Sequence, residues 1–282
     1  MGVARNIAVL ATAALAAGCG GGTQRAATSA HPPPARTVTD TSVAPVARPP
    51  VPRGPHDAPV PILMYHVIAS PPPGTPYPQL WVDPARFGRE IDALAHAGYH
   101  ATTLDAVWRA WHGHGPMPRH PIVLSFDDGY QSQSTTARRM LDKLRWPGVL
   151  NLAVKNVGLK GGLSRNEVRA MIGDGWEIDA HTISHVDLTT LDAGRLRHEV
   201  AGSRAWLRRA FGAPVDFFCY PAGRYNATVE AAVRRAGYNG ATTTNLGEAS
   251  LHDDPYALPR IRVTPQMSAA TLVSLVRHVS SA

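Results

Sequence analysis

From Pro59 to the C-terminus, short apolar and β-branched runs alternate with segments of helical periodicity. A chain with this order of elements folds as a parallel sheet whose connections are helices. About seven or eight such β/α units follow Pro59, which suits a single parallel barrel. The expected strands are residues 62–65, 122–126, 149–154, 176–181, 215–220, 238–243 and 260–263.

Several helix boundaries carry local signals. Asp83 followed by Pro84 is typical of an N-cap and a first helical residue. Ser164, with Glu167 three residues later, has the pattern of a capping box. Gly212 is placed to end the long helical segment before it. These signals predict helices that begin near residues 83 and 164 and one that ends near 212.

Residues 1–18 have the pattern of an export signal. Arg5 precedes the apolar run 7–17, which is too short to cross a bilayer as a mature helix and ends in small residues. Residues 15–19, Leu-Ala-Ala-Gly-Cys, resemble a bacterial lipobox, and this resemblance implies cleavage before Cys19 and lipidation of its thiol. We therefore expect an exported protein, lipid-anchored to the outer face of the cytoplasmic membrane in the cell envelope. The alternative is an ordinary secretory signal with an incidental cysteine, in which case the protein is secreted.

Residues 19–58 separate this signal from the β/α region. They are mainly Gly, Ala, Thr, Ser and Pro with almost no large apolar side chain, and ten prolines fall between Pro32 and Pro61. Such a segment buries too little surface to offset its ordering entropy, so we expect a disordered tether. The predicted organisation is a signal peptide at 1–18, a tether at 19–58 and a folded domain at 59–282.

The net charge is +7, but the 28 basic residues include only three lysines. The arginines are scattered along helical segments, which favours solvated helix faces over a polyanion site, so we expect no nucleic-acid partner. Two cysteines exclude a disulfide-stapled fold. If Cys19 is lipidated, Cys219 has no partner within the chain. We expect a monomer whose only membrane contact is the lipid anchor.

Polar residues follow three of the expected strands, at the carboxyl ends where parallel barrels collect their chemistry. Residues 122–126 are followed by Asp127, Asp128 and Gly129. Adjacent side chains of a strand point to opposite faces, so the two carboxylates can do different work. The alternative is a strand-ending turn, for which Asp-Gly is an ordinary choice.

The next strand end carries two histidines. Alternation places Glu177, Asp179 and His181 on one face, and His185 follows four residues after His181. Two imidazoles at this spacing can bind one metal ion, and a single carboxylate would complete a three-ligand site with an open position. Two histidines four apart also occur by chance in a chain with 13 histidines.

The strand at 215–220 is followed by Pro221, Ala222 and Gly223. No side chain here is a catalyst by residue type. The segment is suited to supply backbone N–H groups and a rigid aromatic wall, so Tyr220 and Pro221 are candidate substrate contacts.

Three motifs carry a family resemblance. Ser-Phe-Asp-Asp-Gly at 125–129, His-Thr-Ile-Ser-His at 181–185 and Phe-Cys-Tyr-Pro-Ala-Gly at 218–223 resemble, in order and approximate spacing, the first three motifs of the polysaccharide deacetylases, carbohydrate esterase family 4 with its NodB homology domain. The likeness covers about residues 59–265. It implies an α/β fold, a single distorted (β/α)7 barrel, that hydrolyses N-acetyl or O-acetyl groups of a polysaccharide.

Matched residue by residue, the resemblance also implies roles. Asp127 would be the general base, Asp128, His181 and His185 would bind one divalent metal ion, and the backbone N–H of Ala222 would stabilise the oxyanion. Such a metal ion lowers the pKa of water toward about 7 and polarises the acetyl carbonyl. We expect Zn, and Co, Ni or Fe are compatible with the same ligands.

Two positions depart from the common pattern of the family. Cys219 stands where many members carry an arginine, and Ala222 stands where many carry an aromatic residue. Arg260 is a candidate to replace the missing arginine near Asp127. The alternative is that Arg260 is an ordinary surface arginine.

Amide cleavage also needs a general acid, for which the chain offers two histidines. His278, on an amphipathic closing helix, would correspond to the late histidine motif of the family. His66 ends the run Leu-Met-Tyr-His at 63–66, which resembles the subgroup that deacetylates poly-β-1,6-N-acetylglucosamine and has its acid histidine on the first strand. We expect His66 to be the general acid, with His278, or a purely structural His66, as the alternatives.

The expected function is metal-dependent removal of N-acetyl groups from a polysaccharide of the poly-N-acetylglucosamine type. The alternatives are a peptidoglycan N-acetylglucosamine deacetylase, an acetylxylan-type O-esterase and a non-catalytic glycan-binding lipoprotein.

Overall fold

The structure is a computed structural model that describes residues 51–279, without the side chain of residue 279. The predicted signal peptide, Cys19 and residues 19–50 of the predicted tether lie outside these residues. No helix within residues 51–279 combines the length and the apolar character needed to cross a membrane.

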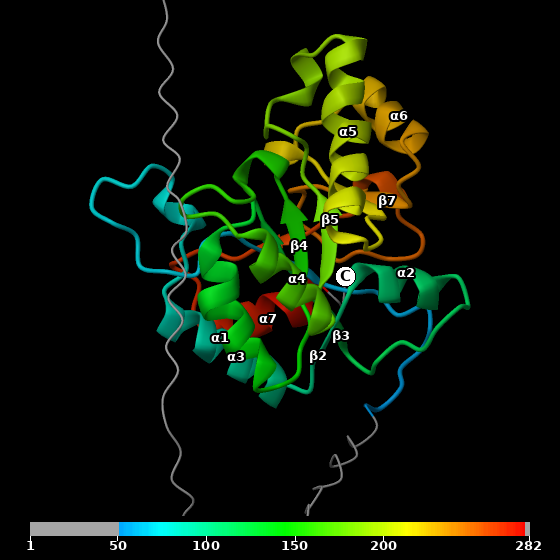
Figure 1. The fold of residues 1–282 in the computed structure, drawn as a ribbon. Coiled ribbons are helices and arrows are strands. Elements are labelled where there is room, and N and C mark those ends of the chain that lie inside the picture. The colour runs from blue at the N-terminus through cyan, green and yellow to red at the C-terminus, as the bar shows by residue number, and fades with distance from the viewer. Residues whose placement is uncertain (1–50, 280–282) are drawn as a thin grey trace, which may run out of the picture. The chain divides into compact units, whose positions relative to one another are not determined.

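A curled sheet of parallel strands forms the centre of the fold (Figure 1). Neighbouring strands follow the order β7-β6-β5-β4-β3-β1-β8, and β2 pairs in parallel with the first residues of β3. The strands are β1 (Ile62–Tyr65), β2 (His100–Thr102), β3 (Pro121–Asp127), β4 (Val149–Leu152), β5 (Glu177–Ala180), β6 (Phe217–Cys219), β7 (Gly240–Thr242) and β8 (Ile261–Arg262).

Helices connect most of the successive strands. Helix α5 packs beside α6, and α1 packs beside α7 (Figure 1). A π-helical turn, η2 (Gln133–Arg138), runs directly into the short helix α3. The helices are α1 (Pro84–His96), α2 (Leu104–Trp111), α3 (Arg139–Asp142), α4 (Arg165–Gly173), α5 (Ala193–Phe211), α6 (Ala227–Arg235) and α7 (Ala269–Val279).

The predicted distorted (β/α)7 barrel is confirmed by the parallel order and the outer helices. The first strand has the predicted bounds, β3 is one residue longer than predicted at each end, and the other predicted strands are shorter than predicted. Sequence analysis missed β2 and α2. A three-residue strand is too short to display alternation, so β2 left no pattern to recognise.

Alternation along β3 separates the apolar core from the interior of the barrel. Ile122, Leu124 and Phe126 belong to the main core, which the sheet shares with the helices. Ser125 and Asp127 face the other way and are buried as polar groups. Strand β3 therefore delivers a carboxylate into the barrel at its carboxyl end.

One segment of chain spans the gap between the two ends of the sheet. Leu258 donates its N–H to the Ala241 carbonyl of β7 at 2.9 Å, and Ile261 of β8 lies in register with Leu63 of β1. Arg260 falls between these two attachments and is 1% exposed. The segment that closes the barrel thus places the guanidinium group of Arg260 inside the protein.

The predicted helix boundaries are confirmed. At the start of α1, Asp83 Oδ1 accepts the N–H of Ala85 at 2.9 Å. Ser164 and Glu167 form the capping box that precedes α4. Gly212 ends α5 with a φ of 66°, in the left-handed region that favours glycine.

Part of the predicted tether packs against the barrel. Gly54 donates its N–H to the Met117 carbonyl at 2.9 Å, and the indole N–H of Trp111 donates to the Ala58 carbonyl at 3.0 Å. The packed region therefore begins before Pro59, and the predicted boundary at residue 58 lies inside it. Composition did not reveal this, because the segment is held by backbone hydrogen bonds and by the small side chain of Ala58 rather than by large apolar side chains.

A carboxyl group is buried between α1 and β1. Glu90 is fully buried, and its Oε2 accepts the hydroxyl of Tyr65 at 3.1 Å. Burial raises the pKa of Glu90 from 4.5 to about 7, although the Tyr65 hydrogen bond and the charge of Arg86 oppose this rise. The folded protein therefore keeps this proton over a pH range in which the unfolded chain has released it.

We expect the free energy of unfolding to fall as the pH rises from about 4.5 to about 7, because only the unfolded chain gains from ionising Glu90 in that range. The loss above pH 7 is on the order of 3 kcal/mol. Glu90→Gln should melt at a higher temperature than wild type at pH 8 and at a similar temperature near pH 4.5. Asp92→Asn, which alters an exposed carboxylate on the same helix, is the control. A melting temperature that changes with pH in the same way in wild type and Glu90→Gln would contradict this account.

Candidate active site

Asp127, the last residue of β3, is held by three side chains inside the barrel. Its Oδ1 accepts Arg260 Nη1 at 2.8 Å and Asn151 Nδ2 at 2.7 Å. Its Oδ2 accepts Arg260 Nη2 at 2.9 Å and faces the Cys219 thiol at 3.8 Å. This two-pronged pairing fixes the plane of the carboxylate. Arg260 therefore lies where the missing family arginine was expected to act, and the surface alternative is wrong.

Charge keeps Asp127 ionised. Burial alone would raise the pKa of Asp127, but the guanidinium of Arg260 and the imidazole of His66 hold it well below its usual range. His66 directly follows β1, and its Nε2 lies 3.7 Å from Asp127 Oδ2. Burial lowers the pKa of His66, while the charges of Asp127 and Asp128 oppose this shift. An imidazole in this position is well suited to gain and lose a proton.

Three further groups converge beside this pair. Asp128 Oδ1 lies 3.6 Å from His181 Nε2 and 3.3 Å from His185 Nε2, and the three ligand atoms all lie within 4.8 Å of one another. Asp128 has a φ of 73°, so the chain leaves the strand direction at this residue. One carboxylate and two imidazoles are a donor set that suits zinc and other divalent first-row ions.

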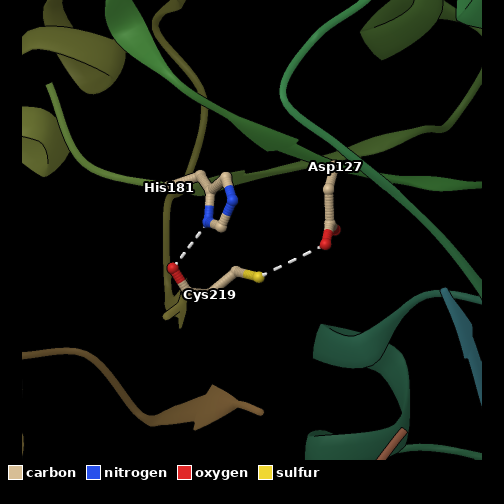
Figure 2. A group of neighbouring side chains, drawn as sticks. All are labelled: Asp127, His181 and Cys219. Carbon is tan, nitrogen blue, oxygen red and sulfur yellow. Dashed lines mark hydrogen bonds between the residues drawn. The ribbon is translucent and has the colours of Figure 1, made fainter. Parts of the chain in front are cut away.

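A hydrogen bond determines which nitrogen of His181 faces Asp128. Its Nδ1 lies 2.7 Å from the carbonyl oxygen of Cys219 (Figure 2). A carbonyl oxygen can only accept, so Nδ1 carries the hydrogen and Nε2 presents its lone pair. Histidines that bind metals are commonly oriented in this way. Burial and the neighbouring His181 lower the pKa of His185, which favours its neutral, ligating form.

The loop between the two histidines is held by a carboxylate of α5. Glu199 Oε2 accepts the N–H groups of Ile183 and Ser184, each at 2.9 Å, and Glu199 Oε1 accepts the Ser184 hydroxyl. Thr182 Oγ1 accepts the N–H of His185 at 2.8 Å. These bonds satisfy consecutive loop N–H groups and hold His185 at a φ of 54°.

A second group of candidate ligands consists of Asp127, His181 and Cys219 (Figure 2). It fits a metal ion less well, because both carboxylate oxygens of Asp127 already accept hydrogen bonds from Arg260. Burial also raises the pKa of the Cys219 thiol, although Arg260 opposes that rise, and a thiol must lose its proton to bind a metal. The group that contains Asp128 is therefore the one that fits.

The turn after β6 offers an available backbone donor. Ala222, with φ 52° and ψ 18°, lies in the short 3-10 helix η5 (Pro221–Gly223). Among the residues that the structure describes, no acceptor binds the Ala222 N–H. The next residue must be glycine, because Gly223 has a φ of 70° and a Cβ there would lie 2.1 Å from Thr244 Oγ1. The predicted oxyanion donor is thus free to bind an external acceptor.

Tyr220 is not positioned as a substrate contact, which corrects the sequence-based expectation. Its side chain is buried, its hydroxyl donates to the Tyr256 carbonyl at 3.0 Å, and its ring stacks on Tyr225 at 4.6 Å. Alternation along β6 explains this, because Cys219 faces the barrel interior and Tyr220 faces the helices. Pro221 is also buried, so its contribution is to the shape of the turn.

The two candidate acid histidines lie in different parts of the fold. His278 is exposed on α7, where its Nδ1 lies 2.7 Å from the Ser274 carbonyl one turn earlier. Helix α7 packs on α1. The structure therefore brings His66, and not His278, to Asp127. Cys219 is a free, buried thiol, whereas Cys19 lies outside the described residues.

Comparison with known proteins agrees with this geometry. Residues 114–241 match the polysaccharide deacetylase family. YxkH of Bacillus subtilis (strain 168), assigned to the same family, is 31% identical over 223 residues, which cover 79% of this chain and 77% of that protein. This chain belongs to the polysaccharide deacetylase family. As a deacetylase of this family, it is a hydrolase of amides that acts on acetylated polysaccharide.

Two further proteins resemble this deacetylase. The structure of the Streptococcus pyogenes deacetylase PplD in complex with acetate matches it with a TM-score of 0.73 and 27% identity, over 78% of this chain and 99% of that chain. The poly-β-1,6-N-acetyl-D-glucosamine N-deacetylase of Escherichia coli (strain K12) is 38% identical over only 56 residues, which are 20% of this chain and 8% of that protein.

Sequence analysis missed several groups that position the site of this deacetylase. Besides Glu199, they include Asn151, which binds Asp127, and Gln133 in η2. Gln133 is fully buried, and its Nε2 donates to the carbonyl groups of His66 at 3.0 Å and Asp127 at 2.6 Å. The Asn in the apolar run 149–154 was a detectable signal, because a polar residue within a buried strand needs a partner.

Glu199→Ala should weaken metal binding by about 10–100-fold, the usual effect of losing a group that supports metal ligands. The reason is that the loop bearing His185 loses the acceptor for two of its N–H groups. Competition with a chelator measures the affinity, and Glu230→Ala on α6 is the control. Wild-type metal affinity in a folded Glu199→Ala protein would contradict the proposed role of the loop.

Proposed function

We propose that this deacetylase uses one divalent metal ion to remove N-acetyl groups from an N-acetylglucosamine polysaccharide of the cell envelope, of the poly-N-acetylglucosamine type. The observation that carries the proposal is the convergence of Asp128, His181 and His185 within 4.8 Å. This group lies beside an ion-paired Asp127 and the imidazole of His66. A hydrolytic metal site of this kind needs a proton acceptor and a proton donor next to it.

Asp128, His181 and His185 are the residues that would hold the ion. A divalent ion there supplies a water of lowered pKa and polarises the acetyl carbonyl. Three protein ligands leave a coordination position open, as catalytic zinc sites require. Zinc is the first candidate, and Co, Ni and Fe suit the same ligands.

Asp127 is the proposed general base. Arg260 and Asn151 hold its carboxylate in one orientation and keep it ionised, ready to accept a proton from the attacking water. Because its pKa is held low, Asp127 does not retain that proton strongly. The imidazole of His66, 3.7 Å from Oδ2, is placed to receive it and to deliver it to the departing nitrogen.

The Ala222 N–H is the proposed donor to the acetyl oxygen as negative charge develops on it. Its N–H binds no acceptor among the described residues, and the adjacent Gly223 holds the turn in a conformation that few other residues adopt. A fixed donor of this kind reduces the reaction barrier because it needs no reorganisation during the reaction.

Two features favour a poly-N-acetylglucosamine substrate within the family. His66 on the first strand and Cys219 in place of the motif arginine are the features that resemble the subgroup acting on that polymer. The 56-residue match to the Escherichia coli enzyme of that specificity points the same way. We also propose that the protein is exported, is anchored through Cys19 and acts as a monomer.

The proposed function is tested by acetate release. Zinc-loaded protein is incubated with poly-β-1,6-N-acetylglucosamine, chitin oligomers, peptidoglycan and acetylxylan, with Asp128→Ala as the inactive control. We expect the highest kcat/KM on poly-β-1,6-N-acetylglucosamine and no release by the variant. Preference for peptidoglycan or acetylxylan would replace the proposed substrate, and failure to release acetate from all four would refute the function.

The two histidines give a direct test of the proton donor. His66→Ala should lower kcat by about 10²-fold or more, the usual scale of acid–base catalysis, with metal content unchanged. His278→Ala should leave kcat within about twofold of wild type, because this side chain is exposed and, among the described residues, hydrogen-bonds to Ser274 of its own helix. A larger loss at residue 278 than at residue 66 would reverse the assignment.

A further inference from the structure

A hollow of about 560 Å³ opens next to the Asp128 end of the site. Two of its walls continue directly from the proposed catalytic loops. Val67 follows His66, and Gly129 and Tyr130 follow Asp128. The lining of the hollow therefore begins one residue after His66 and one residue after Asp128.

Two residues of the hollow also contact Asp128. The Tyr130 hydroxyl donates a hydrogen bond to the Asp128 carboxylate. Asn156 Nδ2 donates to the Asp128 carbonyl at 2.9 Å. A molecule bound in the hollow would thus lie beside the residue that we assign to the metal.

The walls of the hollow combine apolar and polar groups. Trp81 lines it from the loop before α1, where its backbone forms a bridge with Val67. On the loop after β4, Leu159 lines the hollow and is 60% exposed, which is unusual for a large apolar side chain. An aromatic ring and an aliphatic side chain suit the C–H faces of a pyranose, and Thr136 and Asn156 suit its hydroxyl groups.

One charged side chain, that of Lys160, is among the residues that line the hollow, and no acidic side chain is. The nearby carboxylates of Asp128 and Glu167 are hydrogen-bonded to Tyr130 and Gln131 of the lining. Lys160 and Lys155, five residues apart in sequence, are two of the three lysines in the chain. Neither forms an ion pair with a described residue. An ammonium group here attracts hydroxyl and carbonyl oxygens and repels another ammonium group.

Building on the proposed function, we propose that this hollow is a subsite for the sugar unit that flanks the reacting unit, and that it takes that unit in its acetylated form. A polymeric substrate continues beyond the unit at the metal, and the hollow adjoins that position. Removal of an acetyl group leaves an ammonium group at neutral pH. A deacetylated unit would then face Lys160, so the enzyme discriminates against sugars next to one that it has already processed.

The first test compares substrate length. On N-acetylglucosamine and its β-1,6-linked oligomers from dimer to pentamer, we expect kcat/KM of wild type to rise with length. Trp81→Ala should lower kcat/KM on the pentamer about tenfold and leave the monomer, which has no flanking unit, within about twofold. Leu159→Ser alters an exposed residue that folding does not need, and it should reduce the pentamer value in the same direction. Tyr77→Ala, in the same loop and 68% exposed but outside the hollow, is the matched control.

The second test addresses charge. Tetramers with one deacetylated unit next to the reacting unit should be poorer substrates than the fully acetylated tetramer, by about fivefold for an exposed pair of charges. Lys160→Glu should remove or invert this preference, and Lys143→Glu should leave it unchanged. If wild type and Lys160→Glu prefer the fully acetylated tetramer over the partly deacetylated one to the same degree, the charge part of the proposal is wrong.

Binding separates this inference from the proposed function. Calorimetric titration of the metal-free protein and its variants with the fully acetylated pentamer measures occupancy without turnover. Binding that weakens in Trp81→Ala and Leu159→Ser supports the subsite even if no acetate is released, in which case the proposed function alone fails. Acetate release and pentamer binding that are the same in wild type, Trp81→Ala and Leu159→Ser would refute the subsite and leave the function standing.

Discussion

The buried ion pair between Asp127 and Arg260 is the interaction on which the site depends. It joins the end of β3 to the segment that closes the barrel, with two hydrogen bonds of 2.8 and 2.9 Å. Removing one partner of such a pair leaves an uncompensated buried charge, which costs about 3–5 kcal/mol. Arg260 Nη2 also lies 3.2 Å from the Cys219 sulfur. The small Cys219 side chain leaves room for a guanidinium that arrives from another part of the barrel.

Cys219 contacts both the proposed metal ligand His181 and the proposed base Asp127. Its carbonyl oxygen binds His181 Nδ1 and thereby directs Nε2 toward Asp128, while its thiol faces Asp127 (Figure 2). The backbone of one β6 residue thus orients a proposed metal ligand, and its side chain packs against the proposed base. Strand β6 thus fixes the distance between the proposed base, Asp127, and the proposed metal ligand His181.

Local sequence patterns predicted the parts of the site that depend on strand ends. The barrel followed from the alternation of apolar runs and helical segments, and the spacing of His181 and His185 indicated a pair of metal ligands. The resemblance to the polysaccharide deacetylases, and not the local pattern, assigned Asp128 as the third member of the group that the structure brings together. Tyr220 was misplaced because the alternation of β6 turns its ring toward the helices. Glu199 and Gln133 could not be found from sequence, because their roles depend on where α5 and η2 pack. That packing is set by contacts between residues far apart in the chain.

The most direct test of the account is the metal content and kcat of Asp127→Asn, measured on the same sample. The account assigns Asp127 to proton transfer and Asp128 to the metal. It therefore predicts about one metal ion per chain, as in wild type, together with a loss of about 10²-fold or more in kcat. Loss of the metal from Asp127→Asn, or near-normal turnover by it, would contradict this division between the two adjacent carboxylates.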